Sequence, residues 1–267
     1  MKKLFLILIA YLLTFAACKK DKDATTDNTP VVTLQPLQVQ WGLEINHTAT
    51  WCGSCGNWGA PLLHEMAAMG SGKVVAIAVH CSGDPMYNSS LYSSVSSDRI
   101  TGGGIPSFWI GDNKTSSSSE MTALLAKTPI AGMDMKTTKN SNNFAVKAQV
   151  KFFAAGQGDY YLSFFILEDG INGNSSSGEY EQIGTSETNY KHDFVLRAFY
   201  STNFYGEKIA TNPAANAVVD KDFTFNFNNT AWTNKVYVAA AIWHYNPNGD
   251  PSNYIPRYEY INGFVVK

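Results

Sequence analysis

Charged residues are scarce in this sequence, and positive charge is not in excess. Only 16% of the 267 residues are Asp, Glu, Lys or Arg, and 20 basic residues stand against 22 acidic ones. Proteins that bind nucleic acids neutralise phosphates with clustered Lys and Arg. No basic patch or basic stripe interleaved with aromatic residues is present, so the sequence argues against nucleic acid as a partner.

Cysteine and histidine are also few, with 4 and 5 residues respectively. A structural zinc site needs four ligands, which usually come from two paired clusters. Only Cys52 and Cys55 form a closely spaced pair. A mixed site that combines them with Cys81 and either His80 or His47 is a minor alternative. The sequence therefore predicts neither a metal site nor a cofactor.

The longest hydrophobic run lies at the N-terminus. Residues 4–17 are apolar, follow two lysines, and are too few to span a membrane comfortably. Small residues precede Cys18, which resembles the signal of a bacterial lipoprotein. We expect residues 1–17 to be a signal peptide and Cys18 to be lipidated, which would attach the protein to a membrane. An ordinary secretory peptide is the alternative, and in both cases disulfides can persist outside the cytoplasm.

A polar segment follows the leader, and we expect residues 18–38 to be a tether. Residues 19–23 are a run of charges, Lys-Lys-Asp-Lys-Asp. In some Gram-negative bacteria such a stretch after a lipidated cysteine resembles a surface-export signal. The expected location is therefore the outer membrane, on its periplasmic or cell-surface face.

The segment Trp51-Cys52-Gly53-Ser54-Cys55 carries the clearest chemistry. A helix that begins here would present unpaired N–H groups and partial positive charge, which stabilise a thiolate. We expect Cys52 to attack a disulfide, because the thiolate is the nucleophile, and Cys55 to resolve the resulting mixed disulfide. A vestigial or purely structural disulfide stays open as an alternative.

The sequence around this pair predicts a strand, a helix and a strand over residues 39–49, 57–69 and 73–80. Three glycines and then Ile105-Pro106 precede a further apolar strand, and a closing helix is expected over residues 116–127. The order of these elements resembles the thioredoxin fold with its cis-proline loop. The resemblance implies that Ile105 and Pro106 shape a substrate groove.

On the same resemblance, Trp51, Gly53 and Ser54 would complete the groove, with Trp51 shielding the site. A redox partner or an envelope protein with cysteines would be the substrate. The resemblance covers residues 39–128, which we expect to form an α/β thioredoxin-like domain.

Several residues depart from the thioredoxin pattern. Thioredoxins carry a buried carboxylate six residues before the first cysteine, where this chain has Asn46. Glu44 is two residues further back on the same strand face and is a possible substitute. Ser54 stands where reducing thioredoxins have proline. Cys81 follows the second strand and is either an auxiliary thiol or, more commonly, a small buried hydrophobe.

Residues 129–267 are richer in aromatic and β-branched residues and in turn signals. They predict an all-β immunoglobulin-like sandwich domain. No catalytic group stands out there, and His192 and His244 are expected to be structural. The predicted strands are 131–137, 143–152, 159–167, 194–200, 223–227, 235–245 and 258–266.

Five stretches in this second part resemble the outer-membrane-protein-28-related family of bacterial envelope proteins. That resemblance implies a thioredoxin-like domain followed by a β-sandwich in the cell envelope. The leading hypothesis is a lipid-anchored thiol–disulfide oxidoreductase, and the alternative is a surface binding or adhesion protein whose disulfide is inert. The stretches are residues 162–170, 190–192, 195–197, 206–209 and 237–243.

Overall fold

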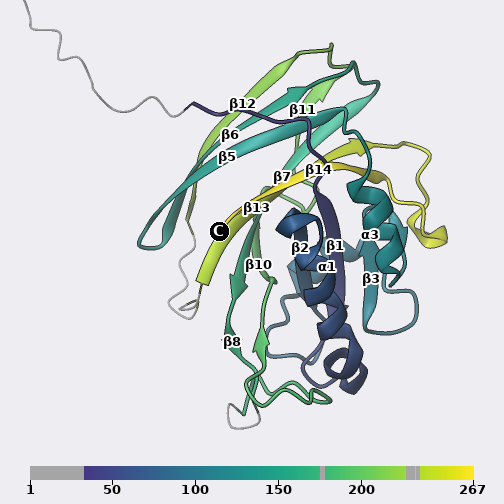
Figure 1. Ribbon diagram of the computed structural model, residues 1–267, viewed down its shortest axis with the longest axis vertical. Helices are drawn as coiled ribbons and strands as arrows, with labels where there is room; N and C mark the ends of the chain where they lie inside the picture. Colours follow the sequence, from purple (N-terminus) through teal and green to yellow (C-terminus); the bar gives the residue numbers. More distant parts are fainter. Residues whose placement is uncertain (1–32, 175–177, 227–231, 233–234) are drawn as a thin grey trace, which may run out of the picture. The chain divides into compact units, whose positions relative to one another are not determined.

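A nine-stranded mixed sheet runs through the part of the chain that the structure describes (Figure 1). The computed structural model describes residues 33–174, 178–226, 232 and 235–267. Eight strands follow the order β14-β13-β7-β10-β2-β1-β3-β4, and the ninth, β11, pairs with β7. Their bounds are β1 (Gly42–Thr48), β2 (Val74–His80), β3 (Ser107–Ile110), β4 (Asn113–Lys114), β7 (Asp159–Asp169), β10 (Val195–Tyr200), β11 (Glu207–Thr211), β13 (Lys235–Tyr245) and β14 (Tyr258–Val266).

The predicted strand–helix–strand unit is confirmed, and this half of the fold is thioredoxin-like. β1 pairs with β2 in parallel and with β3 in the antiparallel sense. Both β1 and β2 are buried along their whole length, as expected of strands covered on both faces. The helices that cover them are α1 (Ala60–Gly72), α2 (Ser89–Ser96) and α3 (Ser118–Leu125).

The three helices lie on two faces of the sheet. Leu63 of α1 packs with Ala76 and Ala78 of β2, and α3 contacts α1. On the other face, the ring of Tyr92 in α2 lies 5.8 Å from that of His47 in β1. The helical backbone of α1 ends before Met69. The two residues after Met69, Gly70 and Ser71, have left-handed backbone conformations. This agrees with the predicted end of that helix.

The prediction of a separate immunoglobulin-like domain is wrong in one respect: its strands do not form a body of their own. Val195 of β10 pairs with Ala78 of β2, and β7, β13 and β14 continue the same sheet. Residues 34–267 form one compact unit, and the expected boundary at residues 128 and 129 does not divide it. β10 covers the free edge of β2, which would otherwise leave a row of backbone groups unpaired.

A second antiparallel sheet supplies the sandwich-like part of the fold. It has the order β12-β6-β5, and its inner side chains pack with those of β7 and β13, including Phe164 and Val238. Buried and exposed residues alternate along β6, as the sequence predicted. The bounds are β5 (Ala131–Asn140), β6 (Asn143–Phe152) and β12 (Val218–Asn226), and a two-stranded ribbon adds β8 (Ile171–Asn172) and β9 (Lys191–His192).

A buried arginine joins the thioredoxin-like part to the C-terminal strands. The Arg99 Nη2 atom donates to Asp112 Oδ1 and to the Tyr258 carbonyl oxygen, each at 2.9 Å. Its guanidinium carbon lies 4.7 Å from the centre of the Trp243 ring. Asp98 accepts a further hydrogen bond from Arg99 at 3.2 Å. Side chains from both parts therefore share one buried cluster.

The expected signal peptide over residues 1–17, the expected lipidation site Cys18 and most of the expected tether lie outside the described residues. The last residues of that segment contact the folded unit, where the Gln35 N–H donates to Asp134 Oδ2 at 2.8 Å. The described helices include none with the length and apolar character needed to cross a membrane.

Candidate redox site

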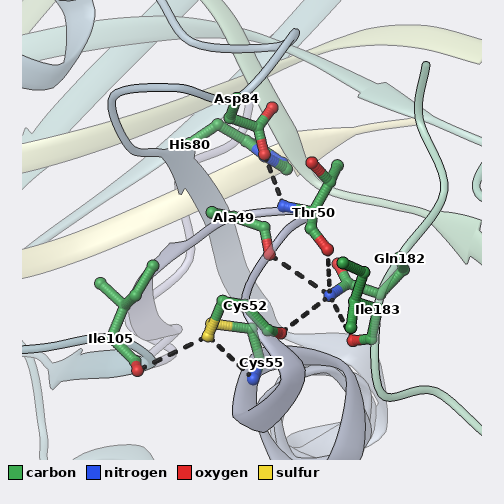
Figure 2. The surroundings of a disulfide bond; sticks show 9 residues. All are labelled: Ala49, Thr50, Cys52, Cys55, His80, Asp84, Ile105, Gln182 and Ile183. Carbon is green, nitrogen blue, oxygen red and sulfur yellow. Dashed lines mark hydrogen bonds and ion pairs between the residues drawn. A yellow bond between two sulfur atoms is a disulfide. The ribbon is translucent and has the colours of Figure 1, made fainter.

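The two cysteines of the motif form a disulfide just beyond the end of β1 (Figure 2). Cys55 begins a short π-helical turn, Cys55–Gly59, which leads into α1. The Cys55 N–H donates to Cys52 Sγ at 3.1 Å. Cys52 is 8% exposed, whereas Cys55 is fully buried. Of the two cysteines, only Cys52 is therefore accessible from solvent, and its attacking role stays a prediction.

The peptide bond between Ile105 and Pro106 is cis, as the resemblance to thioredoxins predicted. The Ile105 carbonyl oxygen lies 3.6 Å from Cys52 Sγ. Gly59 allows this approach, because a Cβ atom there would lie 2.9 Å from the Pro106 ring. The sequence thus brings two segments about fifty residues apart into contact at the disulfide.

A groove of about 440 Å³ lies beside the cis-proline. Ser54, Ile105 and Pro106 line it together with Trp58 and Lys114, so three of the expected groove residues are there. Trp51 and Gly53 are not among its lining residues. Trp51 is 48% exposed, and its Nε1 atom would lie 3.5 Å from a Cβ atom on Gly83. Its shielding role stays a prediction.

Glu44 and Asn46 are buried side by side on one face of β1. Among the described residues, neither Glu44 carboxyl oxygen has a hydrogen-bond partner, and the same holds for Asn46 Oδ1. Their register partners on β2 are Ala76 and Ala78, which cannot offset a charge. Burial raises the pKa of Glu44 well above its usual value. The chain therefore keeps a buried carboxyl two positions from where thioredoxins place theirs.

Substitution of this carboxyl is expected to change how stability depends on pH. The folded state holds a proton on Glu44 that the unfolded chain releases above about pH 4.5. The free energy of unfolding therefore falls as pH rises, by at most about 1.4 kcal/mol per pH unit, until the folded-state pKa is reached. Glu44→Gln should remove this loss, so urea unfolding should find the variant more stable than wild type at pH 7.5 and closer to it near pH 4.5.

Glu65→Gln is the matched control, because Glu65 is exposed on α1. Its stability should follow that of wild type at every pH. Parallel curves for Glu44→Gln and wild type would contradict the assignment of a protonated buried Glu44.

Asp84 fixes the chain just before the disulfide, and no motif in the sequence predicts this role. One carboxyl oxygen of Asp84 accepts from the Thr50 N–H at 2.5 Å and lies 2.9 Å from His80 Nδ1, and the other accepts from the Met86 N–H. Burial opposes the charge, but these contacts together lower the pKa of Asp84 to about 2. The carboxylate is therefore ionised and holds Thr50 in place at neutral pH.

A segment from the C-terminal half meets the same loop from the other side. Gln182 Nε2 donates towards the carbonyl oxygens of Thr50 and Cys52, both at 3.2 Å (Figure 2). The Ile183 N–H donates to the Thr50 carbonyl oxygen at 2.8 Å. No local pattern in the sequence marked these residues, because they lie in a polar loop without a helical or strand period.

The other candidate residues lie outside this arrangement. Cys81 is a buried free thiol, and burial raises its pKa to about 11, so it stays protonated. His192 donates from Nε2 to the Tyr180 carbonyl oxygen at 2.8 Å, and burial lowers its pKa to about 4, so it is a neutral structural residue. Within the described part of the chain, no three His, Cys, Asp or Glu side chains are grouped so that they could hold a metal ion.

The family model described as "Outer membrane protein Omp28" matches residues 103–257. The chain belongs to the Omp28 family. The matched segment includes the cis-proline loop and the segment around Gln182, but it begins after Cys52 and Cys55. Membership in the Omp28 family therefore indicates an outer membrane protein and leaves the activity of the disulfide to be argued from its geometry.

Comparison of structures places the same fold in a second protein. HBP35 of Porphyromonas gingivalis matches with a TM-score of 0.65 and 18% sequence identity, over 87% of this chain and 76% of that one. At this identity the match shows a shared fold. No curated protein matches the sequence.

Proposed function

We propose that this Omp28-family protein exchanges disulfides with cysteine-bearing proteins of the cell envelope, through Cys52 and Cys55. One observation carries the proposal: Cys52 Sγ faces the carbonyl of the cis Ile105–Pro106 bond, while Cys55 is buried behind it. A substrate that binds along Ile105 would bring its sulfur close to Cys52 and not to Cys55.

The exchange conserves atoms and electrons within the four sulfurs involved. The Cys52 thiolate attacks one sulfur of a substrate disulfide, the substrate S–S bond breaks, and the leaving thiolate takes up a proton. Cys55 then loses its proton and attacks Cys52 Sγ, which releases the second substrate thiolate and forms the Cys52–Cys55 disulfide. Two electrons pass from the dithiol to the substrate, and a dithiol donor must restore them. The same steps in reverse oxidise a substrate dithiol.

The local structure supports a reactive Cys52. The Cys55 N–H points at Cys52 Sγ and would stabilise a thiolate there once the disulfide is reduced. Glu44 is the buried carboxyl on the same side of the sheet as Asn46, and we assign it as the auxiliary proton carrier for Cys55. Burial makes its ionised form a stronger base than an ordinary carboxylate, so that form would take the Cys55 proton.

Attachment to the outer membrane through lipid on Cys18 completes the proposal. Membership in the Omp28 family supports a location at the outer membrane. The small residues before Cys18 support lipid attachment at that cysteine. Mass spectrometry of the N-terminal peptide tests for acyl groups on this cysteine, and their absence would leave an unanchored envelope protein.

The reduction potential of the pair and the pKa of Cys52 test the exchange itself. We expect the pKa of Cys52, measured by the pH dependence of alkylation in the reduced full-length protein, to lie below the ordinary value of about 8.5. We expect a potential between about −270 and −120 mV, the range of active thioredoxin-like proteins.

A second function, surface binding or adhesion with an inert disulfide, is favoured by one observation. Asn46 stands where an exchange enzyme would carry its acid, and it cannot accept a proton. A disulfide that resists reduction by glutathione, together with an ordinary pKa for Cys52, would establish this alternative and overturn the exchange proposal.

A further inference from the structure

Residues 181–185, here called the strap, run beside the disulfide loop although they come 130 residues later than Cys52. Gln182 holds the strap in place with a side chain that is 4% exposed. Its Nε2 atom lies 3.1–3.3 Å from four backbone carbonyl oxygens, three of which belong to Ala49, Thr50 and Cys52. Because a carbonyl oxygen only accepts, the amide nitrogen of Gln182 must face them.

The strap and the disulfide loop approach so closely that only glycine fits at the contact. A Cβ atom on Gly56 would lie 2.3 Å from the Ile183 carbonyl oxygen. A Cβ atom on Gly184, which has a φ of +85°, would lie 2.1 Å from the Gly53 carbonyl oxygen. Gly56 of the disulfide loop and Gly184 of the strap therefore make room for this contact.

Large apolar side chains that remain exposed gather around the disulfide. Eight of them are found among the described residues, and three of these lie beside the disulfide loop or line the groove. Trp51 adjoins Cys52, Trp58 lines the groove, and Ile183 lies against Gly53. An exposed apolar patch at a reactive group is typical of a surface that binds a partner.

Ile183 is the member of this group that extends the site away from the cis-proline. Its side chain is 52% exposed, and its Cγ2 atom would be 3.9 Å from a Cβ atom on Gly53. Figure 2 shows Ile105 on one side of the disulfide and Gln182 with Ile183 on the other. The groove beside Pro106 and the Ile183 side chain therefore lie on opposite sides of Cys52.

We propose that the strap is a second wall of the substrate site and selects a polypeptide disulfide whose cysteine has apolar neighbours. Ile183 contacts the apolar side chain on one side of that cysteine, and the groove with Trp58 receives the chain on the other. A ligand must extend across Cys52 to touch both walls, which a small disulfide cannot do. Gln182 is a positioning residue that acts through the strap. The inference rests on the proposed exchange and names its substrate class.

The test compares three substrates with the full-length protein, and dithiothreitol supplies the electrons. Two are short peptides with one cysteine, blocked as a mixed disulfide with 2-mercaptoethanol, and differ in having Leu or Ser on both sides of it. The third is bis(2-hydroxyethyl) disulfide. Ile183→Ser should raise KM for the Leu peptide by about tenfold, the cost of losing one buried aliphatic contact, with kcat unchanged. KM for bis(2-hydroxyethyl) disulfide should not change.

Val218→Ser is the matched control, because Val218 is a comparably exposed aliphatic residue, at 49%, on β12 of the other sheet. It should leave every substrate unaffected. Gln182→Glu tests the positioning role, because a carboxylate of similar size would face the same four carbonyl oxygens and could not donate to them. It should raise KM for the Leu peptide as Ile183→Ser does and spare the small disulfide.

The outcomes separate the inference from the proposed function. If wild type reduces bis(2-hydroxyethyl) disulfide but has the same KM for the Leu and Ser peptides, exchange stands and the strap is not a substrate wall. If Ile183→Ser or Gln182→Glu slows all three substrates equally, the strap has only a structural role and the inference is wrong. If wild type reduces none of them, the proposed exchange fails and the inference falls with it.

Discussion

Replacement of Cys52 by Ala is expected to abolish disulfide exchange, with a fall in kcat/KM of at least about 10³-fold, because no other thiol among the described residues can replace the nucleophile. Cys55 is fully buried behind Cys52, and the burial-raised pKa of Cys81 keeps that thiol protonated. Turnover of bis(2-hydroxyethyl) disulfide by the purified variants measures the effect.

Two further variants give this prediction its controls. Cys55→Ala keeps the attacking thiol but removes the resolving one, so it should accumulate a mixed disulfide between Cys52 and the substrate, visible by mass spectrometry. Cys81→Ala should retain wild-type turnover. Residual activity in Cys52→Ala that disappears only when Cys81 is also replaced would show that the assignment of the nucleophile is wrong.

Replacement of Arg99 by Met is expected to destabilise the protein by about 3–5 kcal/mol, as measured by urea unfolding, because it removes the buried cation that pairs with the buried Asp98 and the partly exposed Asp112. Arg99 and Asp98 are both fully buried, and Arg99 also donates to Asp112 and to the Tyr258 carbonyl oxygen. Met fills a similar volume, so the main loss is the charge and its hydrogen bonds.

The loss of stability in Arg99→Met should grow as pH rises. Burial raises the pKa of Asp112 to about 6, and Arg99 acts against that rise. Without Arg99 the folded-state pKa moves higher, so the folded protein keeps a proton that the unfolded chain releases above about pH 4. Arg99→Met should therefore be closest to wild type near pH 4 and lose most stability as pH rises through 6.

Arg257→Met is the matched control for this prediction. Arg257 also pairs with Asp98, at 3.4 Å, but its side chain is 40% exposed. A partly exposed pair contributes little, so the loss should stay below about 1 kcal/mol. Equal losses for the two variants would mean that the buried cluster does not join the two parts of the sheet.

The elements around the disulfide could be predicted because their signals are local. The apolar run of β2 and the period of α1 are contained in segments of seven and thirteen residues. The cis-proline was recognisable from its neighbours in sequence, and the structure bears it out. Glu44 could be identified as a buried carboxyl because it lies two residues from Asn46 on a strand of known face.

The sheet pairing was missed although the sequence held a clue. β13 is a nearly continuous apolar run and is buried at eight consecutive positions. Such a run indicates a strand covered on both faces, whereas a strand at the surface of a sandwich alternates. Even so, the pattern of apolar residues along β10 does not identify the strand with which it pairs. Only the folded chain shows that Val195 pairs with Ala78.

The sequence by itself determined the thiol pair, the strand and helix that carry it, and the cis-proline loop, because each depends on neighbouring residues. The tertiary structure decided that β10 continues the thioredoxin-like sheet, that Arg99 joins its two parts, and that Gln182 meets the disulfide loop. Those contacts link residues about 100 or more positions apart. The backbone carbonyls of the disulfide loop converge on the Gln182 side chain only after folding. No local sequence pattern can encode that arrangement.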